Sequence, residues 1–108
     1  MKAFGKLSCL AALLLAASLP VQAGDAARGK SLSTTCAACH GADGRSPAPD
    51  FPHLGGQVEE YLYRALLDYK LGVRQDAIMA GQVANLSKQD MRDLAAFYAS
   101  QSVLTLKR

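Results

Sequence analysis

Two cysteines and a histidine stand within five consecutive residues, Cys36-Ala37-Ala38-Cys39-His40. The chain has 108 residues, enough for one domain with a modest core, and a domain of this size often depends on a cross-link or a bound cofactor. Thiols only three positions apart close a very small loop, so a disulfide between them would not clamp distant segments together. We therefore expect these two cysteines to hold something other than each other.

The first 23 residues predict a cleaved secretory signal peptide. A basic opening, Met1–Lys6, precedes an apolar run from Leu7 to Leu19, and Val21-Gln22-Ala23 offers small residues at the usual cleavage spacing. A membrane span is the competing interpretation. It requires about 20 apolar residues, and this run is shorter and is followed by Pro20.

Cleavage after Ala23 leaves a mature domain of residues 24–108, and Cys9 departs with the signal. The mature chain keeps 10 basic and 9 acidic residues, which is not the basic stripe that nucleic acid requires. It has no second apolar run, so we expect it not to span a membrane. Export predicts a location in the periplasm.

The spacing of Cys36, Cys39 and His40 is the signature of covalent haem attachment. Two thiols at this distance can each form a thioether with one vinyl group of a haem. The next residue, His40, then lies under the iron and offers its imidazole as the proximal ligand. The sequence therefore predicts one haem c, with its iron, held through two thioethers.

Two other uses of the cysteines stay open. A thioredoxin-like redox pair needs a βαβ setting, and the sequence shows no alternating strand pattern. A structural zinc ion needs four ligands, which Cys36, Cys39, His40 and His53 would supply. Adjacent Cys39 and His40 are an awkward pair of ligands for one tetrahedral ion.

The periodicity of the mature chain predicts an all-α fold. Asp25 is a good N-cap for a first helix from Ala26 to about Thr34. Prolines make residues 44–56 a loop, and a second helix follows from Val58 and ends near Gly72. Residues 73–86 are expected to form a second loop. Ser87-Lys88-Gln89-Asp90 then resembles a capping box, and one face of the last helix carries Met91, Leu94, Ala95, Tyr98 and Ser102.

A sixth iron ligand, if there is one, comes from later in the chain. Met91 lies on the apolar face of the last predicted helix, where a methionine usually fills core space. His53 lies in the proline-rich loop, where most histidines are solvated. Met79 lies in the second predicted loop, where its thioether can be aimed at the iron. Met79 is the favoured ligand, with His53, Met91 and an open iron as alternatives.

The chain resembles the class I bacterial cytochromes c, and most closely the single-haem domains of the cytochrome c4 and c-553 group. Cys39-His40-Gly41-Ala42-Asp43-Gly44 resembles the haem turn of that group, and Asp93-Leu94-Ala95-Ala96-Phe97-Tyr98 resembles its last helix. Pro52-His53-Leu54-Gly55-Gly56-Gln57 is similar to its P-x-L-x-G-Q segment. Ala65 and Ser33 depart from it, where the group often has a glutamine and an aromatic residue.

The resemblance implies a small cytochrome c fold, with three to four helices around one covalently bound haem. It implies that His40 and Met79 are the axial ligands and that Pro52 lends its carbonyl to the far nitrogen of His40. It also implies that Gly29 lets the first helix cross closely against Leu94 and Phe97. The residues expected around the haem are Leu54, Tyr61, Leu62, Leu66, Ile78 and Leu94.

With both axial positions filled, no position remains for a substrate, so we expect a one-electron carrier and not an enzyme. Redox partner proteins are expected to dock briefly on an exposed haem edge, and the carrier is expected to be a monomer. Two alternatives come from other classes. One is a haem c subunit of a larger oxidoreductase, and the other is a ligand sensor with an open iron.

Overall fold

The computed structural model describes residues 2–3, 5, 12–16 and 23–104. Over these residues the secondary structure is five α-helices and no strand, which confirms the all-α prediction. The helices are α1 (Ala26–Leu32), α2 (Thr34–His40), α3 (Glu59–Leu71), α4 (Ala77–Val83) and α5 (Lys88–Ala99). Among them, no helix is long and apolar enough to cross a lipid bilayer.

The first predicted helix is two short helices. The Asp25 carboxylate accepts a hydrogen bond from the Arg28 N–H and caps α1 as predicted, but α1 ends at Leu32 and not at Thr34. At Ser33 both the backbone N–H and the side-chain hydroxyl donate to the Lys30 carbonyl, which interrupts the helical ladder. The chain then restarts as α2, which carries the cysteine–histidine motif.

The middle and last helices follow the prediction closely. α3 ends at Gly72, whose φ of 75° is the left-handed conformation that favours glycine at this position. α5 begins with a capping box, in which the Ser87 hydroxyl accepts from the Asp90 N–H and the Asp90 carboxylate accepts from the Ser87 N–H. Ser102 lies beyond the end of α5 and is exposed, so its predicted place on the apolar face is wrong.

Residues 73–86 are not a continuous loop, because α4 lies within them. The Asp76 carboxylate accepts a hydrogen bond of 2.9 Å from the Met79 N–H and so caps the first turn of α4. This helix and the break at Ser33 raise the number of helices above the three to four expected. Met79 therefore lies on a short capped helix.

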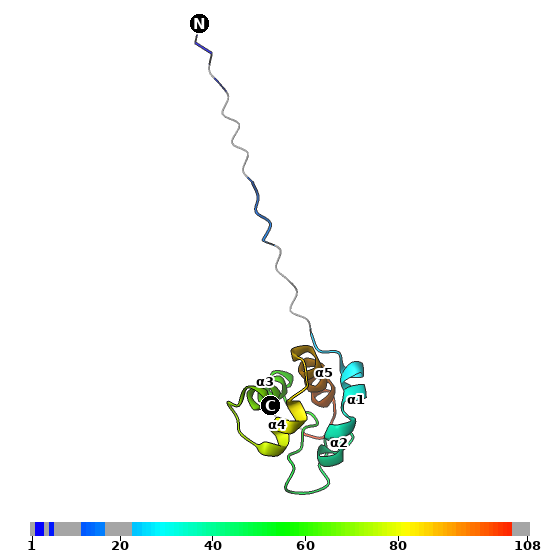
Figure 1. Ribbon diagram of the computed structural model, residues 1–108. Coiled ribbons are helices and arrows are strands. Elements are labelled where there is room, and N and C mark those ends of the chain that lie inside the picture. The colour runs from blue at the N-terminus through cyan, green and yellow to red at the C-terminus, as the bar shows by residue number, and fades with distance from the viewer. Residues whose placement is uncertain (1, 4, 6–11, 17–22, 105–108) are drawn as a thin grey trace.

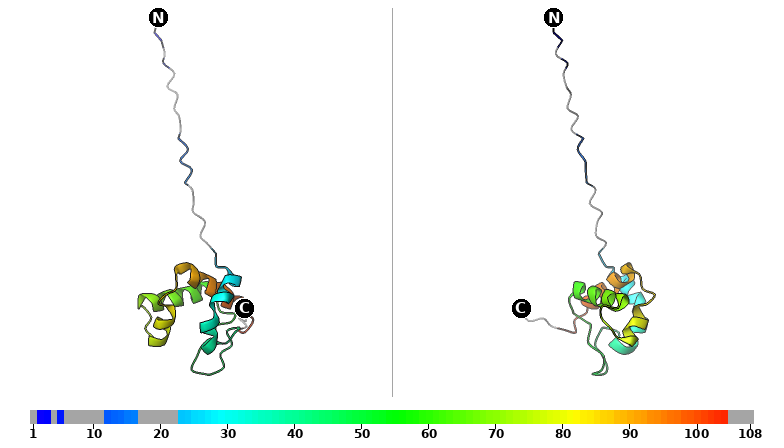
Figure 2. Two further views of the ribbon diagram at one scale, coloured as in Figure 1. Left: turned by 45° about the vertical axis from the view of Figure 1, so that its right-hand side comes forward. Right: turned by 60° about the vertical axis from the view of Figure 1, so that its left-hand side comes forward.

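α5 is the centre of the packing. It contacts α1 on one side and α3 on another, and α4 in turn packs against α3 (Figure 1). The left view of Figure 2 shows the pair α1–α2 and the pair α3–α4 on opposite sides of the domain. The core is a cluster of buried side chains drawn mainly from α3 and α5: Leu62, Tyr63, Met91, Leu94, Ala95, Phe97 and Tyr98.

The long loop between α2 and α3 is tied to itself and to α5. The Gly44 carbonyl accepts from the Leu54 N–H at 2.8 Å, and the Gly56 N–H donates to the Tyr98 carbonyl at 2.9 Å. Backbone bonds therefore hold this proline-rich segment in place, even though each proline removes one donor.

Candidate cofactor-binding site

A cavity of about 580 Å³ opens between the two helix pairs. Its volume is within the range of about 300–1,000 Å³ that small-molecule and cofactor pockets occupy. Its walls come from α2, the long loop, α3, α4 and α5, and most of them are apolar. All the predicted site residues contribute to these walls: Cys36, Cys39, His40, Pro52, Leu54, Tyr61, Leu62, Leu66, Ile78 and Met79. Leu94, predicted beside them, also lines the cavity.

The α2 helix turns both cysteines and the histidine toward this cavity. Residues three or four apart share one face of a helix, so Cys36 faces the same way as Cys39 and His40. Both thiols are half-buried and neither is in a disulfide. The motif thus presents two free thiols and one imidazole on a single wall.

The imidazole of His40 is oriented by the backbone of the long loop. Its Nδ1 lies 2.8 Å from the Pro52 carbonyl oxygen. Because a carbonyl oxygen only accepts, Nδ1 must donate, and a neutral ring then has its free lone pair on Nε2. Phe51 adds an edge-on ring contact with a centroid separation of 6.4 Å. His40 itself is 8% exposed, so its ring is held in one orientation.

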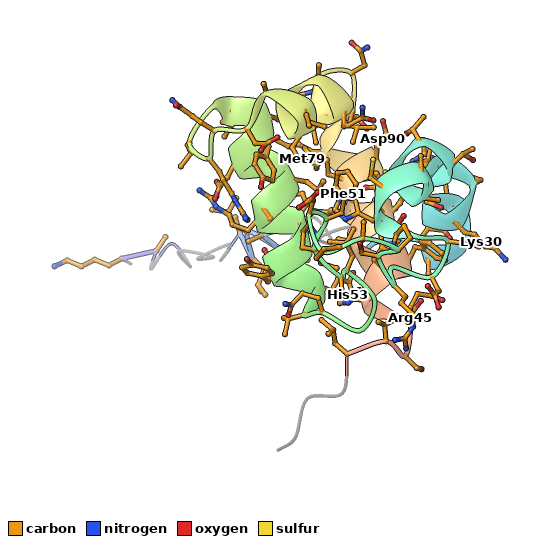
Figure 3. All side chains as sticks on the ribbon, turned by 90° about the horizontal axis from the view of Figure 1, so that it is seen from below. Lys30, Arg45, Phe51, His53, Met79 and Asp90 are labelled. Carbon is orange, nitrogen blue, oxygen red and sulfur yellow. The ribbon has the colours of Figure 1, made fainter. Side chains whose placement is uncertain are left out.

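The three candidates for a second axial ligand lie in different surroundings. Met79 is half-buried and lines the cavity from α4 (Figure 3). Met91 is fully buried in the core and does not line the cavity, in agreement with its predicted packing role. His53 also lines the cavity, but it is exposed and its Nδ1 accepts a hydrogen bond from the Ser46 N–H.

The chemistry of the Cys36 thiol differs from that of an attacking redox cysteine. Burial raises the pKa of the Cys36 thiol, so it stays protonated at neutral pH. An attacking cysteine requires the opposite shift, because the thiolate is the nucleophile. Among the described side chains, no group of three or more His, Cys, Asp or Glu residues is placed to hold a metal ion.

Sequence reasoning missed several residues of the cavity walls. Phe51 has no periodic signal, because it lies in the irregular loop, and its only marker was its place next to Pro52. Tyr98 was assigned to the apolar face of the last helix, but a helical pattern cannot distinguish core from cavity. Other lining side chains outside the predictions are Thr35, Gln57, Tyr69, Asp76, Gln82 and Ala95.

Tyr98 is a buried polar group in this wall. It is 3% exposed, and burial, with a smaller effect from the Cys36 thiol, raises the pKa of Tyr98 to about 12. Its hydroxyl makes no hydrogen bond of normal geometry within the described part of the chain. The nearby Ser33 hydroxyl already donates to the Lys30 carbonyl. A buried donor without a partner is costly, which is consistent with a wall that completes its contacts when a cofactor binds.

These residues fit a haem. The cavity is apolar and large, its two thiols are free, and Nε2 of an oriented imidazole is available on the same wall.

Comparison with known proteins gives the family. The profile of the family described as Cytochrome c matches residues 26–102. The chain is 53% identical over 81 residues to cytochrome c4 from Pseudomonas aeruginosa, which covers 75% of this chain and 40% of that protein. It is 44% identical over 82 residues to cytochrome c-554(548) from Halomonas halodenitrificans, which covers 73% of this chain and 99% of that protein.

A solved structure shows the same fold. Reduced recombinant cytochrome c4 from Pseudomonas stutzeri superimposes with a TM-score of 0.71 at 45% identity, covering 74% of this chain and 47% of that one. The chain thus spans about two fifths of the length of the cytochrome c4 from Pseudomonas aeruginosa and nearly all of the shorter relative. It belongs to the cytochrome c family, as a class I c-type cytochrome of the cytochrome c4 group.

Proposed function

We propose that this protein is a periplasmic one-electron carrier with one haem c. Cys36 and Cys39 hold the haem through thioethers, and His40 and Met79 are the iron ligands. The observation that carries the proposal is the hydrogen bond from His40 Nδ1 to the Pro52 carbonyl, which leaves Nε2 free beside two unpaired thiols in an apolar cavity.

When bound, the haem supplies the Fe(III)/Fe(II) couple, and the chain tunes it. The Pro52 carbonyl fixes the ring of His40 and increases its basicity. A thioether ligand from Met79 favours the electron-rich Fe(II) state and raises the reduction potential. The apolar walls exclude water, which disfavours the extra positive charge of Fe(III). Two filled axial positions leave none for a substrate, so we assign no catalytic residue.

Residues 1–23 are proposed to be a cleaved signal peptide and residues 24–108 the exported domain. Leu13, Leu14 and Leu15 are 85%, 94% and 89% exposed, so these three side chains add nothing to the core. The helical domain begins at Ala26, shortly after the proposed cleavage point. Three leucines that lie outside the core suit a segment that is removed.

Docking partners are proposed to be redox proteins that meet the carrier at the rim of the cavity. Tyr61 and Ile78 line the cavity and are 54% and 62% exposed, so they form an apolar edge that faces solvent. The exposed apolar side chains Leu71 and Val73 favour a second candidate, a subunit bound stably to a larger oxidoreductase. Fixed-stoichiometry co-purification with a dehydrogenase distinguishes this subunit from a free monomeric carrier.

The test is a visible spectrum of the protein made with c-type maturation machinery, in both oxidation states. We expect a sharp c-type α-band on reduction and the weak far-red band of methionine-ligated Fe(III) on oxidation. Met79→Leu removes the far-red band, whereas the matched variant Met91→Leu keeps it, because Met91 lies in the core. Loss of the band in Met91→Leu alone contradicts the ligand assignment. Absence of haem after competent maturation contradicts the proposed function itself.

A further inference from the structure

Two hydrogen bonds of 2.8 Å meet at the dipeptide Pro52-His53. The Pro52 carbonyl accepts from His40 Nδ1, and the His53 Nδ1 accepts from the Ser46 N–H. His53 is exposed, as most loop histidines are, but its bonding partner is the backbone of a residue that is only 9% exposed. One ring nitrogen of an exposed side chain thus accepts a hydrogen bond from the backbone N–H of a buried residue.

The loop between Ser46 and His53 has few other means of holding its shape. Pro47, Pro49 and Pro52 have no N–H to donate. Within the loop, the Ser46 hydroxyl donates to the Ala48 carbonyl and accepts from the Ala48 N–H at 3.2 Å, and the Phe51 N–H donates to the Ala48 carbonyl at 3.3 Å. The bond from Ser46 to the His53 ring therefore closes the loop just inside the backbone bond between Gly44 and Leu54.

We propose that His53 is a positioning residue for the axial ligand His40. Its Nδ1 accepts from the Ser46 N–H, and the next residue, Leu54, donates its N–H to the Gly44 carbonyl, so both residues that follow the Pro52 carbonyl are anchored. With the following chain held at these two points, the Pro52 carbonyl keeps its alignment with His40 Nδ1. The inference rests on the proposed function, because it concerns the ligand role of His40.

The geometry predicts the direction in which loss of the His53 anchor changes the reduction potential. A well-aligned carbonyl raises the basicity of the imidazole, and a more basic ligand stabilises Fe(III) over Fe(II). Removal of the His53 anchor lets the Pro52 carbonyl drift and weakens its bond to His40. The reduction potential then rises, although His53 itself does not touch the ligand.

The experiment compares His53→Ala with His53→Asn and His53→Gln in the holoprotein. The Asn side-chain oxygen occupies nearly the position of Nδ1 and can still accept from the Ser46 N–H, whereas the Gln oxygen stands one bond farther out. We expect His53→Ala to raise the ratio of reduced to oxidised protein at fixed ambient potential, which is an upward shift of the reduction potential. His53→Asn restores the wild-type ratio, and His53→Gln behaves like His53→Ala.

A purely structural role gives a different result. It lowers the melting temperature of His53→Ala and leaves the reduction potential unchanged, which overturns the proposal. Equal shifts in His53→Ala and His53→Asn overturn it as well, because the acceptor atom is then irrelevant. The far-red band recorded on each variant shows whether methionine ligation is intact, so failure of the proposed function is seen separately, as a missing band in the wild-type protein.

A measurement on the wild-type chain removes any dependence on variants that fold poorly. An N–H···N hydrogen bond transmits a scalar coupling between its two nitrogens. We expect a coupling between the Ser46 amide nitrogen and His53 Nδ1 in the reduced, diamagnetic protein labelled with nitrogen-15. Absence of this coupling while the Ser46 and His53 signals are resolved overturns the proposal.

Discussion

The buried carboxylate of Asp93 accepts a 2.7 Å hydrogen bond from Arg28, which joins α5 to α1 across 65 positions of sequence. The Asp25 N–H and the Gln89 amide also donate to the same carboxylate, each at 2.8 Å. Asp93 is 1% exposed, so three donors compensate a charge that is almost completely removed from water. This carboxylate connects the beginning of the domain to its last helix.

Asp93→Asn should lower the free energy of unfolding by about 1–3 kcal/mol, because it removes the charge that the three donors satisfy and places an amide N–H₂ among them. Urea unfolding of the holoprotein measures this change. The matched control is Glu60→Gln, since Glu60 is exposed and lies 3.8 Å from Arg92. Surface pairs of this kind contribute about 0–1 kcal/mol. Equal losses in the two variants would contradict the role given to Asp93.

Acid should destabilise the domain through Asp90 and Asp93. Burial raises the pKa of Asp93, but the hydrogen bonds from the Asp25 backbone, Arg28 and Gln89 outweigh burial, so its pKa lies below the ordinary value. The hydrogen bond from the Ser87 backbone, followed by that from Arg28, lowers the pKa of Asp90. A carboxyl group with a depressed folded-state pKa contributes stability above its unfolded pKa of about 3.9 and loses it as pH falls through the folded value.

The contribution of Asp90 and Asp93 to the free energy of unfolding should therefore be nearly constant from neutral pH to about pH 5. It should decrease below about pH 4. Urea titrations at a series of pH values measure the slope. Asp93→Asn should show a shallower fall than the wild-type chain. A slope that is the same in both proteins would show that Asp93 does not contribute to the acid transition.

Gly29→Ala should destabilise the domain, although alanine favours a helix by about 1 kcal/mol over glycine. Gly29 is buried where α1 crosses α5, and a Cβ there would collide with the Asp93 carbonyl oxygen and press on the Cβ of Phe97. The predicted close crossing against Phe97 is thus present, and the atoms nearest to the Gly29 position belong to Asp93 and Phe97. Overpacking of this kind costs about 1–3 kcal/mol.

Gly81→Ala in α4 is the matched control, because a Cβ at Gly81 meets no atom within 4 Å. It should stabilise the domain by about 0.5–1 kcal/mol, since helix propensity acts there without a clash. Thermal unfolding of the two variants should shift in opposite directions. A stabilised Gly29→Ala protein would show that α1 can move away from α5 at little cost.

Asp76→Ala should loosen Met79. The Asp76 carboxylate caps α4 through the Met79 N–H, and loss of an N-cap costs about 1 kcal/mol. In the proposed holoprotein the far-red band should then disappear at a lower temperature than in the wild-type protein. Asp76→Asn retains a capping oxygen and should keep the band. If the band of Asp76→Ala disappeared at the same temperature as that of the wild-type protein, the cap would not contribute to Met79 ligation.

The parts of this protein that the sequence predicted well depend on residues close together in the chain. The C-x-x-C-H motif lies within five positions, and the capping box of α5 within four. The apolar period of α3 and the glycine that ends it are equally local. Such features depend on backbone geometry and on neighbouring side chains, so they can be recognised without knowing the rest of the fold.

The sequence was less informative where two outcomes have similar local energies. Residues 26–34 suit one helix by propensity, but the hydroxyl of Ser33 bonds back to Lys30 and the chain bends into two. Residues 73–86 follow Gly72, include Gly81 and have few periodic apolar positions, so they suggested a loop. The Asp76 cap and packing against α3 make α4 a helix.

By itself, the sequence determined the helical class, the C-x-x-C-H motif and the candidates for the second ligand, because each depends on spacing along the chain. Only the tertiary structure decided that Met79 lines the cavity while Met91 fills the core, and that Asp93 is buried with Arg28 while other charges stay in water. Those outcomes depend on which segments, distant in sequence, exclude water from each other. Burial and hydrogen bonding between them are set by the packing of the whole domain.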